Sequence, residues 1–185
     1  MFRSRLVSAA LSVAVIGGLA ACGNGGDTVA AEDYAADVCG AVKDYTDTVS
    51  ERVSEIQSEA PEDPEAGKEV LTNFLGDMVG DTDTLISEVE DAGVPDVDNG
   101  EEIADDVRSA LGQVKSILED AQSQIEDLPT DDPQAFAEGT QEIGTSLQES
   151  GQEVQSGLEG LQSSELEEAS QDIEVCQEIQ AGFAP

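Results

Sequence analysis

Acidic residues dominate this chain of 185 residues, with 42 Asp and Glu against seven Lys and Arg and a formal net charge of −35. A nucleic-acid-binding protein needs basic patches that neutralise phosphates, so this composition excludes that class of function. The chain also contains no His and no Trp. Because His is the most versatile base near neutral pH and the commonest metal ligand, its absence excludes most catalytic triads and zinc sites.

The N-terminal segment, positions 1–21, has the three parts of an export signal. Arg3 and Arg5 supply a short positive region, and residues 6–20 are apolar or small and carry no charge. This stretch is shorter than the roughly 20 residues that a membrane-spanning helix needs. We therefore expect a signal peptide over residues 1–21 that is cleaved between Ala21 and Cys22.

The cleavage site resembles a lipobox, because Leu-Ala-Ala at positions 19–21 precedes Cys22. In signals of this kind the cysteine sulfur receives diacylglycerol before cleavage, and the acylated cysteine becomes the new N-terminus. Two acyl chains hold a protein firmly, at about 0.8 kcal/mol per buried methylene. The resemblance implies lipid on Cys22 and a location on the extracytoplasmic face of the cell membrane. An ordinary secretory signal followed by a chance cysteine is the alternative.

The chain after the predicted cleavage site keeps all 42 acids but only five bases, which gives a net charge of −37. We expect a flexible, Gly-rich linker over residues 22–31 and one folded domain over residues 32–182. The acidity has two interpretations, a solvated surface coat or a docking face for cations or a basic envelope protein. In either case an anionic bilayer surface would repel the domain, so the lipid on Cys22 would have to hold it there.

Apolar residues recur at steps of three and four along this domain, which predicts an all-α fold. Four long stretches and one shorter stretch show this spacing, and they begin at Tyr34, Leu71, Ile103, Phe136 and Leu166. No stretch shows sustained period-two alternation, so we expect no β-sheet. Short connections favour antiparallel neighbours, which predicts an up-down four-helix bundle followed by a shorter fifth helix.

Capping residues mark several of the expected helix boundaries. The Asp-Pro pairs at 63–64 and 132–133 each combine an N-cap residue with proline at the first helical position. Asn99 and Glu102 have the spacing of a capping box at the start of the third helix. These signals predict long helices joined by short loops.

The first two helical stretches resemble the next two when Tyr34 is aligned with Ile103. The same alignment places Pro64 on Pro133, and most apolar positions between them also coincide. The pattern predicts two similar αα-hairpins packed together. The alternative is that two heptad-like patterns of equal length align by chance.

Cys39 and Cys176 are the two cysteines that remain when Cys22 is acylated. An even pair in an exported protein predicts a disulfide, with two free thiols as the alternative. A disulfide requires Cα atoms within about 7 Å of each other. The chain must therefore turn back near residues 163–164 and pack against the first helix, which leaves an axial offset of about 8 Å between the cysteines.

Five glycines interrupt the fourth helical stretch, and each costs up to about 1 kcal/mol relative to Ala. Gly144 and Gly151 flank its apolar stripe. They would let a neighbouring helix approach closely, or leave a groove for a ligand or a partner helix. The simpler interpretation is a weak helix that tertiary packing holds in place.

No nucleophile motif, phosphate-binding loop or redox CxxC sequence occurs in the chain. Residues 96–102 approach the composition of a calcium loop, but Gly100 is one position early and Val107 occupies the position of the final acidic ligand. We therefore predict no catalytic residue, no cofactor and no metal site, and we do not expect an enzyme.

Taken together, the chain resembles small uncharacterised helical lipoproteins of high-GC Gram-positive (actinobacterial) bacteria. The resemblance rests on the lipobox at Cys22, the acidic domain, Cys39 early in the first helix, Leu-Pro-Thr-Asp-Asp-Pro at 128–133, and Cys176 near the end. It implies a surface location and no particular activity. The predicted function is a non-enzymatic, lipid-anchored interaction or accessory module, with a carrier of a small ligand or cation between helices as the alternative.

Overall fold

The computed structural model describes residues 28–59, 61, 63–159 and 164–182, and it confirms that this part of the chain is mainly helical. The predicted signal peptide, its cleavage site and Cys22 lie outside the described residues. The elements in chain order are β1 (Thr28–Val29), α1 (Ala31–Glu59), α2 (Pro64–Asp91), β2 (Val94–Pro95), α3 (Gly100–Asp127), α4 (Pro133–Glu159), α5 (Ser164–Gln171) and α6 (Glu174–Gly182).

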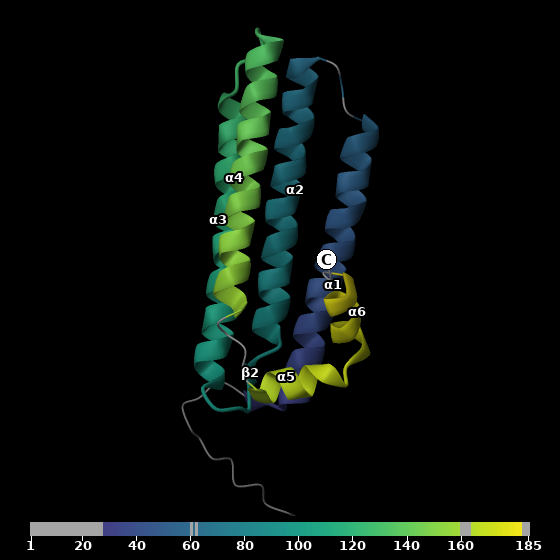
Figure 1. Ribbon diagram of the computed structural model, residues 1–185, viewed down its shortest axis with the longest axis vertical. Helices are drawn as coiled ribbons and strands as arrows, with labels where there is room; N and C mark the ends of the chain where they lie inside the picture. The colour runs from purple at the N-terminus through teal and green to yellow at the C-terminus, as the bar shows by residue number, and fades with distance from the viewer. Residues whose placement is uncertain (1–27, 60, 62, 160–163, 183–185) are drawn as a thin grey trace, which may run out of the picture.

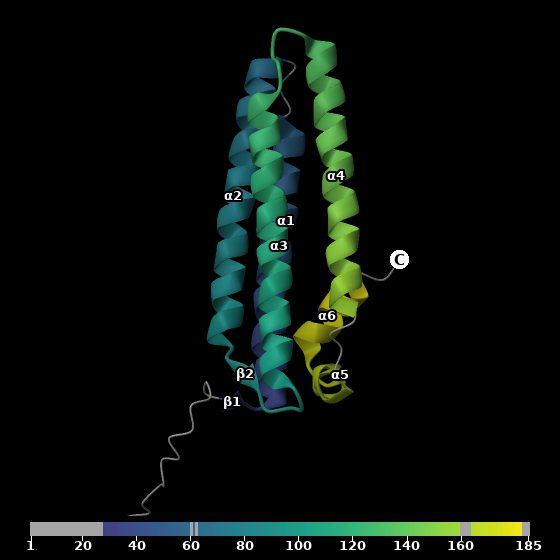
Figure 2. The ribbon, with the colours of Figure 1, turned by 90° about the vertical axis from the view of Figure 1, so that its left-hand side faces the viewer.

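The four long helices lie side by side along the longest axis of the molecule (Figure 1). Helix α1 packs on α2, α2 packs on α3, and α3 packs on α4. One end of the molecule, which we call the base, carries both strands, α5 and the beginnings of α1 and α3. The opposite end, which we call the tip, carries the beginnings of α2 and α4 (Figures 1 and 2).

The two Asp-Pro signals cap helices as the sequence predicts. The Asp63 carboxylate accepts a hydrogen bond from the Ala66 N–H at 3.0 Å, and the Asp132 carboxylate accepts one from the Gln134 N–H at 3.0 Å. Each carboxylate satisfies backbone donors that the first helical turn leaves without partners. The starts of α1 and α3 are separated by the same number of positions as the prolines that begin α2 and α4.

The predicted capping box at Asn99 is wrong. Asn99 has a φ of 61°, in the left-handed region, and its side chain makes no capping hydrogen bond to α3. The chain turns tightly between β2 and α3: Asn99 takes the left-handed conformation, and position 100 is glycine because a Cβ there would collide with the carbonyl group of Pro95. Asn is one of the few residues besides Gly that tolerates this backbone conformation.

The expectation of no β-structure is also wrong, although the sheet is minimal. Strands β1 and β2 pair in parallel, with Thr28 opposite Val94 and Val29 opposite Pro95. The N–H of Asp96 extends the pairing by donating to the Val29 carbonyl oxygen at 2.8 Å. Two residues are too few to show period-two alternation, and β1 comes from the last residues of the predicted linker 22–31. That part of the expected linker is fixed to the α2–α3 connection.

Two clusters of buried side chains hold the long helices together. The cluster nearer the tip joins α2, α3 and α4 through Leu75, Ala121, Ile125 and Ile143. The cluster nearer the base joins α1 and α2 through Ala41, Leu85 and Val89, with Val107 and Leu111 of α3 packed against it. Among the described side chains, α4 contributes to the first cluster and α1 to the second.

The fifth predicted helix is two helices rather than one. Helix α5 lies across the base, the helical conformation is interrupted at residues 172–173, and α6 turns up beside α1 (Figures 1 and 2). Both short helices pack on α1. The interruption absorbs the axial offset that a single straight helix would have left between Cys39 and Cys176.

Candidate functional site

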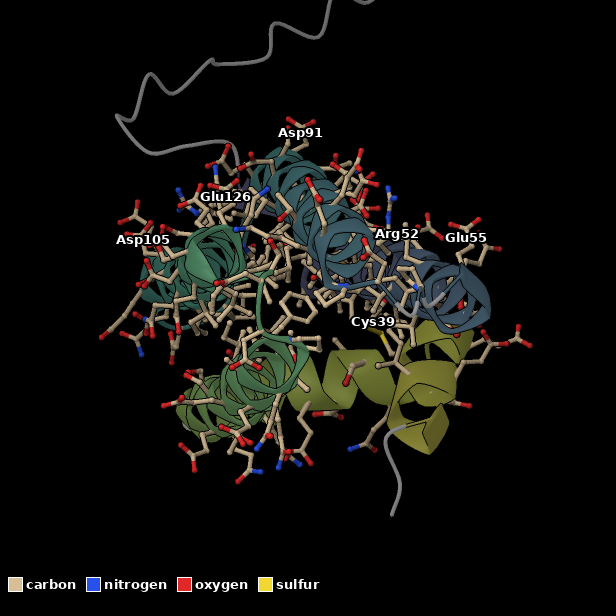
Figure 3. The ribbon with its side chains drawn as sticks, turned by 90° about the horizontal axis from the view of Figure 1, so that it is seen from above. Cys39, Arg52, Glu55, Asp91, Asp105 and Glu126 are labelled. Atoms are coloured by element: carbon tan, nitrogen blue, oxygen red, sulfur yellow. A yellow bond between two sulfur atoms is a disulfide. The ribbon has the colours of Figure 1, made fainter. Side chains whose placement is uncertain are left out.

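The disulfide predicted between Cys39 and Cys176 is confirmed. The two Cα atoms lie 5.2 Å apart, and the bond joins residues 137 positions apart in sequence. Figure 3 shows the Cys39 sulfur directed away from the long-helix cluster and towards the short C-terminal helices. Cys176 is 2% exposed, so the bond is covered where α6 meets α1. It ties the C-terminal helices to the first helix of the domain.

The predicted lipid attachment site at Cys22 lies outside the described residues, but the structure shows where the chain that leads from it joins the domain. Thr28 is the first described residue, and its pairing with Val94 places it at the base (Figure 1). Six residues, 22–27, separate the start of the predicted mature chain from this fixed point. None of the described helices combines the length and apolarity that a bilayer crossing requires.

Gly144 and Gly151, the residues of the predicted groove, do not line a cavity that we can identify in the described structure. Both are exposed on α4, and a Cβ added to either would meet no atom within 4 Å. Within the described part of the chain, no neighbouring helix approaches the backbone closely at these two positions. A small hollow of about 90 Å³ between α3 and α4 is lined instead by residues that include Ile117, Ala121 and Ser146.

A groove between α1 and α2 is the most acidic concave feature of the described residues that we identify. It consists of two adjoining hollows of about 370 Å³ and 220 Å³. Its carboxylate-bearing lining residues are Asp37 and Asp44 of α1, with Asp81, Glu88 and Asp91 of α2. Asp44 and Glu88 line both hollows, which makes the two hollows one continuous feature, and we call it the acidic groove.

Small residues create the space in the acidic groove. Ala36, Gly40 and Ala41 of α1 and Ala92 after α2 line its larger hollow. A Cβ added to Gly40 would meet nothing within 4 Å, so the groove is open at that point. The apolar stripes of α1 and α2 do not predict this groove, because most of its lining residues lie beside those stripes. The available signal was the presence of the small residues Ala36, Gly40 and Ala41 beside the two acids of α1.

All five basic residues that follow Cys22 are engaged within the described structure. Four of them form ion pairs, which are Lys43 with Asp47, Arg52 with Asp77 and Asp81, Arg108 with Asp105, and Lys115 with Asp83. The fifth, Lys68, donates to the Leu128 carbonyl oxygen at 3.0 Å. Carboxylates project outward around the long helices (Figure 3), so the described surface offers predominantly negative charge.

Arg52 forms an ion pair with Asp81, a residue that lines the acidic groove. Its Nε donates to Asp81 at 2.5 Å and its second guanidinium nitrogen donates to Asp77 at 2.8 Å, so it links α1 to α2. The hydrogen bond to Asp81 raises the pKa of Arg52 above its ordinary value. Lys43 and Lys115 also have raised pKa values, chiefly through hydrogen bonds to Asp47 and Asp83. These three cations therefore stay charged across the physiological pH range.

Of the two tyrosines of the chain, Tyr34 is buried and Tyr45 is partly buried in the helix packing. Tyr45 OH lies 3.2 Å from Thr82 Oγ1, and Thr82 in turn donates to the Met78 carbonyl oxygen at 2.8 Å. Tyr34 is 3% exposed, and its hydroxyl oxygen has no hydrogen-bond partner among the described residues. Burial raises the pKa of both phenols. Neither tyrosine forms an exposed binding platform, although Tyr45 borders the smaller hollow of the acidic groove.

Comparison of the chain with protein-family models, with curated proteins and with solved structures gives no match. Within the described residues, no three Cys, Asp or Glu side chains are grouped closely enough to hold a metal ion.

Proposed function

We propose that this protein is a lipid-anchored envelope lipoprotein that acts as a non-enzymatic interaction module for a basic partner, and that the acidic groove is its docking site. The observation that carries the proposal is the imbalance of charge in a concave feature. Five carboxylate residues line the groove and one of them, Asp81, is paired with Arg52, whereas every base of the domain already has an internal partner. A cationic partner would supply the missing counter-charges.

The spacing of the groove carboxylates fits a partner with distributed cations better than a single metal ion. Asp37 and Asp44 are seven residues apart on α1, and Asp81 and Glu88 are seven residues apart on α2. Seven residues of helix span about 10 Å. Basic side chains at every third position of a polyproline II segment lie on one face and have nearly the same spacing, about 9 Å. A segment of this kind could place one Lys or Arg beside Asp37 and the next beside Asp44, while Asp81 keeps Arg52.

The docking proposal is tested by crosslinking in intact cells with a double variant, Asp44→Asn with Glu88→Gln. These changes remove two charges shared by both hollows while keeping the side-chain shapes. We expect recovery of the crosslinked basic partner to fall at least fivefold. The matched control is Glu142→Gln with Glu149→Gln, two exposed acids on α4. Equal losses in both double variants would show that total charge matters and that the groove does not.

The lipid anchor is supported by the Leu-Ala-Ala-Cys sequence at 19–22 and by the apolar segment before it. Its test is a Cys22→Ser variant followed by fractionation of membranes. We expect the variant to leave the membrane fraction while its domain still folds, because Cys39 and Cys176 remain available for their disulfide. A variant that stays membrane-bound after a high-salt wash would contradict the anchor.

A carrier of a small cationic molecule is the second candidate, because the larger hollow of about 370 Å³ falls within the size range of ligand pockets. A thermal melt separates the two proposals. A rise of several degrees with calcium or with a small organic cation, but not with sodium chloride of equal ionic strength, would favour the carrier. An unchanged melt, together with a crosslinked basic protein, would favour the interaction module.

We also propose that the long helices derive from two copies of one αα-hairpin that together form an up-down four-helix bundle. The equal offsets from α1 to α3 and from α2 to α4, measured between helix starts, support this. So does the approach of Gly67 in α2 to its counterpart Phe136 in α4, whose ring would lie 3.3 Å from a Cβ at position 67. Helix α1 packs on α5 and α6, and extensive contact between α1 and α4 is absent among the described residues.

A further inference from the structure

The place where the N-terminal segment joins the domain restricts how the domain can be oriented at a membrane. Thr28 and Val29 are hydrogen-bonded into the α2–α3 connection, so the start of the domain cannot swing freely around the bundle. The pairing lies at the base, together with α5 (Figure 2). The Asp98 N–H donates to the Glu165 carboxylate of α5 at 3.2 Å, which joins the same connection to the C-terminal helices.

The distance from Cys22 to this fixed point is short. Six residues lead from Cys22 to Thr28, and six residues span at most about 20 Å when fully extended. Each long helix has 27 to 29 residues, which corresponds to roughly 42 Å at 1.5 Å per residue. A lipid on Cys22 therefore confines the base to the membrane surface but leaves the tip free to lie far from it.

Charge decides between a bundle that lies flat and a bundle that stands. Acidic side chains occur on all four long helices, and residues 116–185 contain no Lys or Arg. A flat bundle would bring a whole side of the domain within the Debye length, about 8 Å at physiological salt, of an anionic bilayer. A standing bundle brings only its base near the surface, and the tether is long enough to keep even the base beyond that distance.

We infer that the domain stands on its base at the membrane, with β1, β2 and α5 towards the bilayer and the tip directed away from it. This inference rests on the proposed lipid anchor at Cys22. The acidic groove begins near Asp37, about 9 Å along α1 from Ala31, and it opens on the side of the bundle. A partner therefore reaches it laterally, from the aqueous layer above the membrane, and needs no membrane-inserted segment.

A side-chain hydrogen bond joins two segments of the chain at the tip. Lys68 of α2 donates to the Leu128 carbonyl oxygen at the end of α3, which ties the beginning of α2 to the α3–α4 connection. Pro129, Asp131 and Asp132 in that connection are exposed. These residues are the parts of the domain that the inferred orientation places farthest from the bilayer.

The orientation is tested by energy transfer from a fluorophore on the domain to an acceptor on lipid headgroups. The acylated full chain is placed on vesicles of phosphatidylcholine with phosphatidylglycerol. With Cys22 acylated and the other cysteines in a disulfide, an introduced cysteine is the one thiol to label. Glu102→Cys reports the base and Asp131→Cys reports the tip, and both changes remove one exposed carboxylate. A second pair, Glu101→Cys and Asp127→Cys, repeats the comparison if either first variant folds poorly.

We expect transfer from position 102 to be at least twice that from position 131. Equal transfer from both positions, or greater transfer from 131, would overturn the inferred orientation. Flotation of the same vesicles separates this result from the anchor itself. If the acylated chain does not float with the vesicles, or if the Cys22→Ser chain floats equally well, the anchor proposal is wrong and the orientation is wrong with it.

Discussion

Cys39 of α1 and Cys176 of α6 are joined across a sequence separation of 137 with their Cα atoms 5.2 Å apart, and this bond fixes the C-terminal helices to the start of the domain. Helices α5 and α6 are short, with eight and nine residues, and helices of that length are unstable in isolation. Their position therefore depends on packing against α1 and on the disulfide.

Replacing both cysteines, Cys39→Ser with Cys176→Ser, is expected to lower the free energy of unfolding by about 2–5 kcal/mol. The reason is that the bond closes a very long loop and restricts the unfolded chain. Urea titration followed by circular dichroism measures the effect. Adding reductant should shift the wild-type midpoint towards that of the double variant and leave the double variant unchanged. A wild-type midpoint insensitive to complete reduction would contradict the prediction.

Loss of the hydroxyl group at Tyr34 and at Tyr45 should change the free energy of unfolding in opposite directions. Tyr34→Phe removes a buried oxygen without a partner and is expected to stabilise the domain by up to about 1 kcal/mol. Tyr45→Phe removes the contact with Thr82 and is expected to destabilise it by about 1 kcal/mol. Chemical denaturation of the two variants, with equal m-values, provides the measurement. The same sign for both changes would show that the environment of Tyr34 differs from the one described.

Stability is expected to fall as the pH rises above about 10. Burial raises the pKa of Tyr34 and Tyr45 above the ordinary value of 10.0. A raised folded-state pKa gives a contribution that is fully present below the unfolded pKa and is lost as the pH passes through the folded pKa. The pKa values of Lys43, Arg52 and Lys115 are also raised, which gives the same sign.

Absorbance in the near ultraviolet, which reports tyrosinate, can be recorded together with circular dichroism during this alkaline titration. Tyr34 and Tyr45 are the two tyrosines of the chain, so the signal is theirs. We expect ionisation to coincide with loss of helix. Complete tyrosine ionisation near the ordinary pKa of 10.0, in a domain that stays folded, would show that the phenols are exposed.

Replacing a glycine by alanine tests whether the structure has space for a Cβ atom at that position. Gly144→Ala and Gly151→Ala should each stabilise the domain by up to about 1 kcal/mol, because Ala favours helix and the space around both positions is open. Gly100→Ala should destabilise it by about 2 kcal/mol or more, because the new Cβ would collide with the Pro95 carbonyl group. Thermal melts measure all three. Destabilisation by the α4 substitutions would instead indicate a neighbour that requires glycine there.

Arg52→Met is expected to destabilise the domain by about 1 kcal/mol, because it breaks the link from α1 to Asp77 and Asp81 of α2. Asp81 is partly buried and would lose its cation. The matched control is Lys43→Met, which breaks an exposed ion pair within one helix turn of α1 and should change the midpoint little. The unfolding midpoints of both variants in denaturant are measured at low and at high salt. Salt screens ion pairs, so it should reduce the difference in midpoint between the two variants.

Local patterns in the chain were enough to place the long helices and the two ends of the disulfide. Period-three-and-four spacing identifies the stripe of each helix that must be buried, and an Asp-Pro pair specifies an N-cap wherever it occurs, so α2 and α4 begin where expected. The cysteine count, together with the predicted export signal, was sufficient to pair Cys39 with Cys176. These are local properties, or properties of composition, that hold whatever the neighbours are.

The three-dimensional packing determines which element covers the apolar stripe of each helix. The apolar stripe of α1 meets α2, α5 and α6, and the interruption at residues 172–173 exists because the last segment must cross the base before it reaches Cys39. The β1–β2 pair and the acidic groove arise where distant segments meet, and two-residue pairings and runs of small residues carry almost no periodic signal. Periodicity encodes the buried face of a helix, whereas the partner of that face is set by packing across the whole chain.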